Sequence, residues 1–260
     1  QAAIDANNLR GGTMDLRKQR VLVTGGTRGI GLELARAFLR RGAAVVVSGR
    51  AKTAQAAVAE LGTEVTYIAA DLSTKDGPAD LAHRVREAFG APTMLVNNAG
   101  VQFNHDWRET ADSDRHARAV AETRVNLLAP VELTALFLDD LLGAPEAAIV
   151  NVTSILALAP KASAPVYSAT KAALRSFTRG LRYQLDGTPN VRVVEVLPPV
   201  VDTGMTAGRG KDKMAPADVA IAVLQGIDAG EDEIWIGKAR IIRRLRRFAP
   251  GIVARILRKS

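Results

Sequence analysis

The chain contains no cysteine, so neither disulfide bonds nor thiolate metal sites are available to it. This absence fits a reducing compartment, and we expect a cytoplasmic protein. No apolar run approaches the roughly 20 residues that span a bilayer, and the N-terminus lacks the basic-then-apolar pattern of a signal peptide. The three histidines, His83, His105 and His116, are scattered without the spacing of metal ligands, so no metal site is predicted.

Acidic residues are missing from residues 238–260, which carry nine lysine and arginine side chains. The formal net charge of the whole chain is +8, so the rest of the chain is close to neutral. The basic character therefore belongs to the C-terminal segment alone, and nucleic acid is not predicted as a partner.

Apolar residues recur at helical spacing in this segment, at Ile241, Leu245, Phe248 and Ile252. Pro250 and Gly251 are expected to break the helix in two. Two interpretations stay open. The segment is either an amphipathic helix that packs on the body with its arginines in water, or a peripheral membrane anchor that adds a membrane contact to a cytoplasmic protein.

The rest of the chain is predicted to be one α/β domain, since 260 residues of which 47% are hydrophobic can bury a large core. Valine-rich runs alternate with segments of helical periodicity, which is a βαβ rhythm. Strands are expected near residues 20–24, 44–48, 64–69, 93–97, 147–153, 191–197 and 233–236. Such continuously apolar strands favour a doubly wound, Rossmann-type parallel sheet of seven strands with helices on both faces.

Three regions follow from these patterns. Residues 1–13 are polar and are interpreted as a disordered extension or an expression remnant. Residues 14–237 form the predicted dinucleotide-binding and catalytic domain, and residues 238–260 form a basic amphipathic extension.

The first strand runs into the sequence TGGTRGIG, which contains Gly25, Gly29 and Gly31. A glycine turn between a strand and a helix lets backbone amides and the helix N-terminus approach a pyrophosphate. The second strand ends in Gly49 and Arg50 rather than in the carboxylate that holds the ribose of NAD. Together with Arg28, Arg50 can bind a 2′-phosphate, so the sequence predicts NADP(H), with NAD(H) as the less favoured cofactor.

Five ordered motifs resemble those of the short-chain dehydrogenases/reductases. They are TGGTRGIG at 24–31, DL at 71–72, NNAG at 97–100, Asn126, and Ser154 with YSATK at 167–171. The resemblance implies that Asp71 contacts the adenine edge, that Asn97 and its neighbours line the adenosine side, and that Thr203 touches the nicotinamide carboxamide. The complete predicted set of cofactor-binding residues is Gly25, Thr27, Arg28, Gly29, Ile30, Gly31, Arg50, Asp71, Leu72, Asn98, Ala99, Gly100, Tyr167, Lys171, Pro198, Val201 and Thr203.

Tyr167 and Lys171 share one helix face at the i, i+4 spacing. A carbonyl that accepts a hydride needs a proton donor and a hydrogen-bond donor at its oxygen, and Tyr167 and Ser154 can supply these. A cation close to the phenol favours the phenolate, and Lys171 is that cation. The family resemblance adds that Lys171 reaches the nicotinamide ribose and that Asn126 holds a water that relays protons to it. Catalysis is therefore assigned to Asn126, Ser154, Tyr167 and Lys171.

The residues expected at the substrate are mostly apolar, namely Val101, Phe103, Ile155, Leu156, Val200 and Met205. We therefore expect a hydrophobic or bulky ketone or aldehyde. Trp107 is interpreted as interior packing rather than as a substrate contact. Pro199 stands where the family usually has glycine, so we expect a nicotinamide pocket of a different shape. The segment from Gly204 to Met214 is shorter than in many members of the family, which predicts an open cleft.

Two other functions are alternatives to the NADP-dependent oxidoreductase. One is an NADP-sensing regulator with little turnover, which has no need of Ser154, Tyr167 and Lys171 together. The other is a membrane-associated interaction protein that acts through its tail. The resemblance also implies a homodimer or homotetramer in which the central helix and the Tyr167 helix pair across subunits.

Overall fold

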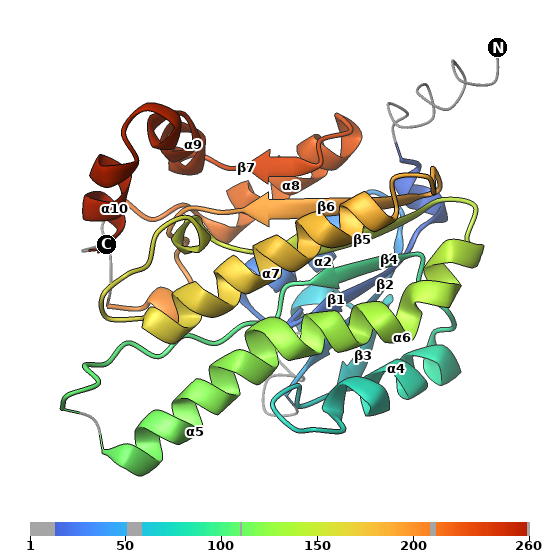
Figure 1. Cartoon of the computed structure of the whole chain (residues 1–260). Coiled ribbons are helices and arrows are strands. Elements are labelled where there is room, and N and C mark those ends of the chain that lie inside the picture. The colour runs from blue at the N-terminus through green and yellow to red at the C-terminus, as the bar shows by residue number, and fades with distance from the viewer. Residues whose placement is uncertain (1–13, 51–58, 110, 209–211, 259–260) are drawn as a thin grey trace.

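The computed structural model describes residues 14–50, 59–109, 111–208 and 212–258. The predicted extension at residues 1–13 lies outside the described residues. The strands form one sheet of seven in the order β3-β2-β1-β4-β5-β6-β7, and all six neighbouring pairs are parallel (Figure 1). The predicted doubly wound, Rossmann-type sheet is confirmed.

All seven predicted strands are present, and their ends lie within one residue of the expected ones. They are β1 (Arg20–Thr24), β2 (Ala44–Gly49), β3 (Val65–Ala69), β4 (Met94–Asn97), β5 (Ala147–Val152), β6 (Val191–Leu197) and β7 (Glu233–Trp235).

Helices connect the strands and cover both faces of the sheet. The α-helices are α2 (Gly29–Arg40), α4 (Gly77–Ala88), α5 (Asp112–Thr123), α6 (Ala129–Gly143), α7 (Pro165–Gln184), α8 (Pro216–Asp228), α9 (Lys238–Phe248) and α10 (Pro250–Arg258). Short helical turns are η1 (Leu16–Lys18), η3 (Arg124–Leu128), η4 (Ile155–Ala157) and η5 (Gly204–Thr206). The turn η3 is a π-helix that joins α5 to α6.

Successive side chains of each strand pack on opposite faces of the sheet, in two separate parts of the core. On β1, Val21 and Val23 pack in the cluster that includes α2 and α8, whereas Leu22 packs in the cluster that includes α4 and α6. Because successive side chains of a strand point to opposite faces, a continuous apolar run is needed to fill both clusters. This requirement explains the valine-rich runs of the sequence.

The C-terminal helices cover a third, smaller cluster. Ala239 and Ile242 of α9 and Val253 and Leu257 of α10 are buried there. The predicted break is present, since α9 ends at Phe248 and α10 begins at Pro250.

The apolar residues that recur at helical spacing in this segment lie mostly on its outer side. Ile241, Phe248 and Ile252 are exposed, and Leu245 is only partly buried. The two helices therefore pack on the domain through other apolar residues than this stripe, and a membrane contact of the exposed stripe stays a prediction. None of the helices in the described ranges has the length and apolar character needed to cross a membrane.

The order of the strands reverses between β1 and β4, which are neighbours in the sheet although β2 and β3 lie between them in the chain. Loops that leave the carboxyl ends of these two strands diverge to opposite sides, so a crevice opens between them. The residues that follow β1, β2, β4, β5 and β6 all lie at this edge.

Candidate active site

A cavity of about 300 Å³ lies at the carboxyl edge of the sheet. It is lined by all seventeen predicted cofactor-binding residues, and by Ser154. The predicted catalytic Tyr167 and Lys171 are among these lining residues, so the structure brings the nucleotide turn and the catalytic helix into one cavity.

The glycine turn after β1 is packed so tightly that Gly25 and Gly31 have no room for a side chain. A Cβ on Gly31 would lie 2.3 Å from the main-chain oxygen of Gly25 and 2.4 Å from the side-chain nitrogen of Asn98. Gly25 and Gly29 have positive φ angles of 63° and 56°, a conformation that glycine adopts without strain. A backbone of this kind at the N-terminus of α2 fits a pyrophosphate, because amides and the helix dipole face the anion without an intervening Cβ.

Asn98 fastens this turn to the end of β4. Its side-chain nitrogen donates to the main-chain oxygens of Thr24 and Gly25 at 2.9 and 3.2 Å. The hydroxyl of Thr24 accepts from the backbone nitrogens of Asn98 and Ala99 at 3.0 and 3.1 Å. These bonds fix the cradle before any ligand enters it.

Asn97 does not take the place that was expected for it. Its side chain is buried inside the sheet and donates to Oδ1 of Asn151 at 2.9 Å, and Asn151 in turn donates to Thr178 at 2.9 Å. Asn97 is not among the residues that line the cavity, whereas its neighbours Asn98 and Ala99 are. The expectation was wrong for Asn97 because its side chain faces Asn151 and, through it, Thr178 of α7 rather than the carboxyl edge of the sheet where the cavity lies.

The ends of β2 and β3 bring a cation and a carboxylate together. Arg50 follows β2, and its charge is one of the causes that lower the pKa of Asp71, after hydrogen bonds from Ser73. The carboxylate oxygen Oδ1 of Asp71 accepts from the backbone nitrogen and the hydroxyl of Ser73 at 2.9 and 2.6 Å. A Cβ on Gly49 would lie 2.6 Å from Thr27, so no acidic side chain fits at the end of β2 without rearrangement.

Ser154 and Tyr167 come from consecutive elements and line the same cavity. Ser154 follows β5 and caps η4, where its hydroxyl oxygen accepts from the backbone nitrogen of Leu156 at 3.1 Å. Tyr167 lies in the first turn of α7, which begins with Pro165, a residue favoured at this position because its missing amide has no helical partner there. Both side chains are nearly buried.

Lys171 follows Tyr167 by one turn and points along the same face of α7. Its Nζ donates to the main-chain oxygen of Val152 at 2.8 Å and lies 5.9 Å from the centre of the Tyr167 ring. Burial lowers the pKa of Lys171 to about 8. The site therefore holds an amine whose proton is available near neutral pH, beside a phenol.

Asn126 lies behind the cavity wall rather than on its surface. It is fully buried in the π-helical turn η3, and its side chain exchanges two hydrogen bonds of 2.8 Å with the backbone of Val101. It also donates to the hydroxyl of Thr170 at 3.3 Å. Asn126 thus fixes the loop after β4 next to α7, and the water-holding role that the resemblance implies stays a prediction.

A second side chain anchors the same loop. Glu122 of α5 is buried, and its carboxylate accepts from the backbone nitrogen of Phe103 at 2.7 Å. Burial raises the pKa of Glu122. Phe103 is held outside the cavity, with Arg118 over its ring at 5.9 Å, so its expected place at the substrate was wrong.

The other residues expected at the substrate line the cavity, namely Val101, Ile155, Leu156, Val200 and Met205. Trp107 does not, and its ring stacks on His105 with 6.0 Å between ring centres. The expected interior packing of Trp107 was also wrong, because the side chain is partly exposed on the outer surface.

The segment after β6 closes one side of the cavity. Thr203 caps η5 in a reciprocal arrangement with Thr206, and a Cβ on Gly29 would lie 3.0 Å from the methyl group of Thr203. Beyond η5, Met214 returns to pair with Val200 and Asp202 through backbone hydrogen bonds of 3.0 and 2.9 Å. The short segment is thereby held at both ends. Residues 209–211 of it lie outside the described residues.

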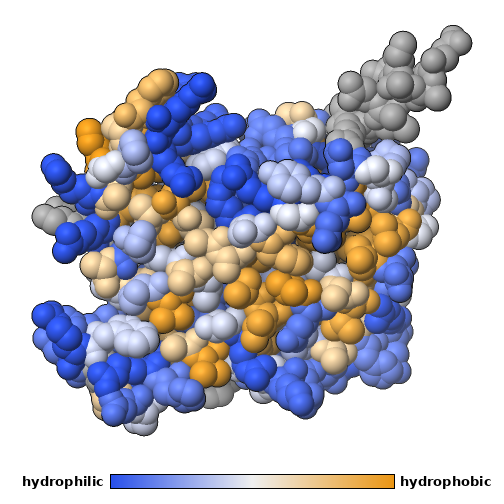
Figure 2. All heavy atoms as spheres, in the orientation of Figure 1, coloured by the Kyte–Doolittle hydropathy of each residue, from blue (hydrophilic) through white to orange (hydrophobic). Residues whose placement is uncertain are grey.

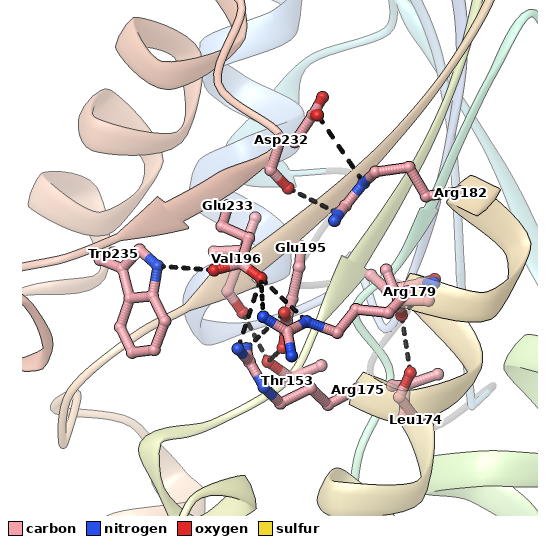
Figure 3. A network of polar contacts seen from close by, with 12 residues as sticks. Thr153, Leu174, Arg175, Arg179, Arg182, Glu195, Val196, Asp232, Glu233 and Trp235 are labelled. Carbon is pink, nitrogen blue, oxygen red and sulfur yellow. Dashed lines mark hydrogen bonds and ion pairs between the residues drawn. The ribbon is translucent and has the colours of Figure 1, made fainter. Parts of the chain in front are cut away.

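A buried ion pair ties the catalytic helix to the sheet. Arg175, one turn after Lys171, pairs with the carboxylate of Glu195 on β6 (Figure 3). The other oxygen of Glu195 accepts from the hydroxyl of Thr153 at 2.7 Å. Burial raises the pKa of Glu195, and the charge of Arg175 opposes this effect. Because Thr153 precedes Ser154, one network positions both the helix and the serine.

Sequence reasoning missed six polar residues of the cavity, namely Ser48, Ser73, Gln102, Thr153, Lys161 and Thr206. Ser73 had a local signal, since an Asp two residues before a serine favours the turn that the structure contains. Gln102 lies beside the NNAG motif, and Lys161 lies in the loop between Ser154 and Tyr167. Neither has a local pattern that separates it from solvated surface.

Comparison with known proteins gives consistent results. A family model described as short chain dehydrogenase matches residues 19–214. The uncharacterized oxidoreductase DltE of Bacillus subtilis is 37% identical over 85% of this chain and 89% of its own. A short chain dehydrogenase from Burkholderia cenocepacia, solved in complex with NADP, is 30% identical over 95% of this chain and 100% of its own, with a TM-score of 0.81. A short chain dehydrogenase/reductase from Burkholderia phymatum, solved with NAD, is 23% identical over 92% of this chain and 96% of its own, with a TM-score of 0.80, and shows the shared fold.

Proposed function

The chain belongs to the short-chain dehydrogenase/reductase family, and we propose that it is an oxidoreductase that interconverts a carbonyl and an alcohol with NADP(H) as cofactor. One observation carries the proposal: the glycine cradle and the side chains of Ser154, Tyr167 and Lys171 line a single cavity. A protein that only bound the nucleotide would have no chemical need for these three polar groups in one nearly buried place.

NADP(H) is proposed rather than NAD(H) because of the charges at the ribose end. Arg28 and Arg50 line the cavity, and the tight contact of Gly49 with Thr27 leaves no room for the carboxylate that an NAD site usually has there. Asp71 is the nearby acid, but its carboxylate oxygen accepts two hydrogen bonds from Ser73. Arginine can bind a 2′-phosphate through two parallel charge-assisted hydrogen bonds.

The side chains of the cavity supply the proton and stabilise the charges of the reaction. NADPH, when bound, supplies the hydride for the carbonyl carbon. Tyr167 gives its phenolic proton to the carbonyl oxygen, and Ser154 donates a hydrogen bond to the same oxygen as negative charge develops on it. The ammonium of Lys171 stabilises the resulting phenolate. Together these groups lower the barrier to forming the alcohol.

The substrate is proposed to be a hydrophobic or bulky ketone or aldehyde. Val101, Ile155, Leu156 and Met205 give the substrate end of the cavity an apolar wall. Apolar walls favour substrates by burying their surface, and a few polar groups such as Gln102 then set orientation.

A homodimer or homotetramer is also proposed. Apolar side chains on the outer surfaces of α5, η3 and α6 are exposed at Val120, Leu128, Leu136 and Leu142. A shallow apolar hollow beside them is lined by Trp107, Leu127, Pro165, Val166, Ala169 and Ala173. Exposed apolar surface of this kind marks protein contacts, and a second copy of the chain could cover it. A cytoplasmic location remains a prediction.

The test is a fluorescence titration of the purified protein with NADPH and NADH in parallel, using Arg50→Ala and Tyr167→Phe. We expect Arg50→Ala to weaken NADPH binding roughly 10- to 100-fold, the range for charge-assisted hydrogen bonds, and to leave NADH binding unchanged. Tyr167→Phe should keep NADPH binding and lower the rate of ketone reduction about 10²- to 10⁴-fold. Arg40→Ala, at an exposed position outside the cavity, is the matched control. Failure of the unchanged protein to bind either nucleotide would contradict the proposal.

A further inference from the structure

The two C-terminal helices have an inner and an outer apolar face. On the inner face, Val253 and Leu257 of α10 are buried against a cluster that includes Ile155, Leu197 and Trp235. The backbone nitrogen of Ala162 also donates to the main-chain oxygen of Arg258 at 3.1 Å. The inner face fixes both helices on the domain, so the outer face has a defined orientation.

The outer face leaves four large apolar side chains in water. Ile241 and Phe248 of α9 are 65% and 83% exposed, and Ile252 and Ile256 of α10 are 51% and 48% exposed. Figure 2 shows apolar and strongly hydrophilic side chains side by side over the corner where α9 and α10 lie in Figure 1. We refer to these four residues and the cations around them as the outer surface.

The cations of the outer surface have few acidic neighbours. Residues 238–258 contain Lys238, Arg240, Arg243, Arg244, Arg246, Arg247, Arg255 and Arg258 and no acidic residue. Across the described ranges, the one ion pair recorded for this set joins Lys238 to Asp212 at 3.5 Å. Arg240 donates to the main-chain oxygen of Trp235, and Arg243 lies over the ring of Trp235 at 5.3 Å. The positive charge is thus left largely without compensation by carboxylates.

Cations and apolar groups also share one stripe. Arg244 lies three residues after Ile241 and four before Phe248, so all three lie along one side of α9. Arg255 occupies the same relation to Ile252 on α10. We propose that the outer surface binds an anionic lipid bilayer, with the apolar side chains among the lipid headgroups and acyl ends and the arginines on the phosphates.

A bilayer suits this surface better than a nucleic acid. Phosphate groups of nucleic acid would satisfy the arginines but leave Ile241, Phe248 and Ile252 without a partner. The remainder of the chain is close to neutral, so it offers no wider basic footprint for a polyanion. An interface that combines apolar burial with anionic headgroups satisfies both kinds of side chain.

Attachment would place the bilayer beside the cavity. Ile155 lines the cavity and also packs in the cluster that holds Val253 and Leu257. The substrate end of the cavity is therefore one layer of side chains from the helices that would rest on the lipid. An apolar substrate dissolved in the membrane would have a short path to it. This consequence rests on the proposed function, whereas lipid binding itself does not.

The test is cosedimentation of the full chain with vesicles of equal parts phosphatidylglycerol and phosphatidylcholine, and with pure phosphatidylcholine. We expect binding to the anionic vesicles that falls as salt is raised, and little binding to the neutral ones. Arg244→Gln with Arg255→Gln should weaken binding roughly 25-fold, about fivefold for each arginine. Phe248→Ser should weaken it roughly tenfold through lost apolar burial.

Matched controls separate this contact from general charge and apolar effects. Lys18→Gln with Arg40→Gln removes two charges at the sheet edge where β1 and β2 begin, and Tyr183→Ser changes an aromatic residue that is 75% exposed on α7. Both controls should bind as the unchanged chain does. The proposal is overturned if the unchanged chain does not sediment with anionic vesicles, or if the control pair loses as much binding. It is also overturned if Phe248→Ser has no effect, because the surface would then bind polyanions in general.

Discussion

Arg175 of α7 and Arg243 of α9 both place their guanidinium groups over the indole ring of Trp235, at 5.2 and 5.3 Å from its centre, but their other partners differ. Arg175 is buried and pairs with Glu195 and Glu233. Arg243 is exposed, and no carboxylate partner is recorded for it within the described part of the chain. One tryptophan thus contacts an arginine that belongs to the core and an arginine that faces outward.

The same division holds for their helices. Along α7, Arg179 pairs with Glu233 at 2.9 Å, and Arg182 donates to the main-chain oxygen of Asp232 at 2.8 Å (Figure 3). The basic side chains of α7 therefore serve the fold and hold the catalytic helix on the sheet. The arginines of α9 and α10 contribute little to such contacts, which leaves them available to an external anion. Burial and acidic partners decide between the two roles, and charge alone does not.

The largest effect is expected when the inward arginine is removed. Arg175→Met leaves the buried carboxylate of Glu195 without its cation, which should lower the free energy of unfolding by about 3–5 kcal/mol. Arg244→Met, on the outer surface, should change it by less than about 0.5 kcal/mol. Urea denaturation of both variants measures the difference.

A second variant tests the reason for that loss. Adding Glu195→Met to Arg175→Met replaces the ion pair by apolar groups, which is often close to neutral for stability. We expect this double variant to recover most of the lost free energy. A loss that persists in full would mean that Arg175 acts through packing on Trp235 rather than through Glu195.

Part of this difference between buried and exposed arginines could be predicted from the sequence. Glu195 is the one acidic residue of the strand VRVVEVL, which is apolar apart from Arg192 and Glu195, and an acid in a buried strand indicates a buried cationic partner. Which cation serves could not be read from the sequence, because Arg175, Arg179 and Arg182 have equivalent places along α7. The choice depends on how the helix crosses β6, which is a property of tertiary packing.

The fold and the cavity were more predictable than these contacts. Continuous apolar strands and the glycine turn are local patterns, and they located all seven strands and the turn after β1, while the resemblance to a family supplied most of the other predicted cofactor-binding residues, which line the cavity. The places of Asn126 and Asn97 were less predictable, because their side chains hydrogen-bond to Val101 and Asn151 on other elements. Which residues of α9 and α10 face inward or outward likewise depends on how the two helices pack on the domain. The spacing of apolar residues in the sequence does not give this information.

The next effect concerns Lys171 of α7, whose charge takes part in the proposed chemistry. Burial gives its ammonium a pKa of about 8 in the folded protein, against 10.5 for an ordinary lysine. Below pH 8 the fold therefore holds a charge that would be better solvated in the unfolded chain. Lys171→Met should raise the free energy of unfolding there by about 2–3 kcal/mol, at about 1.4 kcal/mol per pKa unit less the lost hydrogen bond to Val152, and should abolish ketone reduction.

The pH dependence of this difference has a definite sign. Between about pH 8 and pH 10.5 the unfolded lysine keeps its proton while the folded one has lost it, so the stability of the unchanged chain rises with pH. The advantage of Lys171→Met should therefore shrink across this window and vanish above it. Urea denaturation below and above the window measures this. An advantage that is constant with pH would show that the ammonium is not the cause.

The smallest effect separates the two faces of α10 at neighbouring residues. Leu257 is 2% exposed and packs in the cluster with Trp235, whereas Ile256 is 48% exposed. Leu257→Ala should lower the free energy of unfolding by about 2 kcal/mol, the low end for leucine because a terminal helix can relax around the cavity. Ile256→Ala should change it by less than about 0.5 kcal/mol. In binding to anionic vesicles the order of the two effects should reverse. Ile256→Ala should weaken binding more than Leu257→Ala does, because Ile256 lies on the outer surface and Leu257 does not. If Ile256→Ala instead destabilises the protein in solution as much as Leu257→Ala does, both faces of α10 belong to the core and the outer surface is not free to bind a membrane.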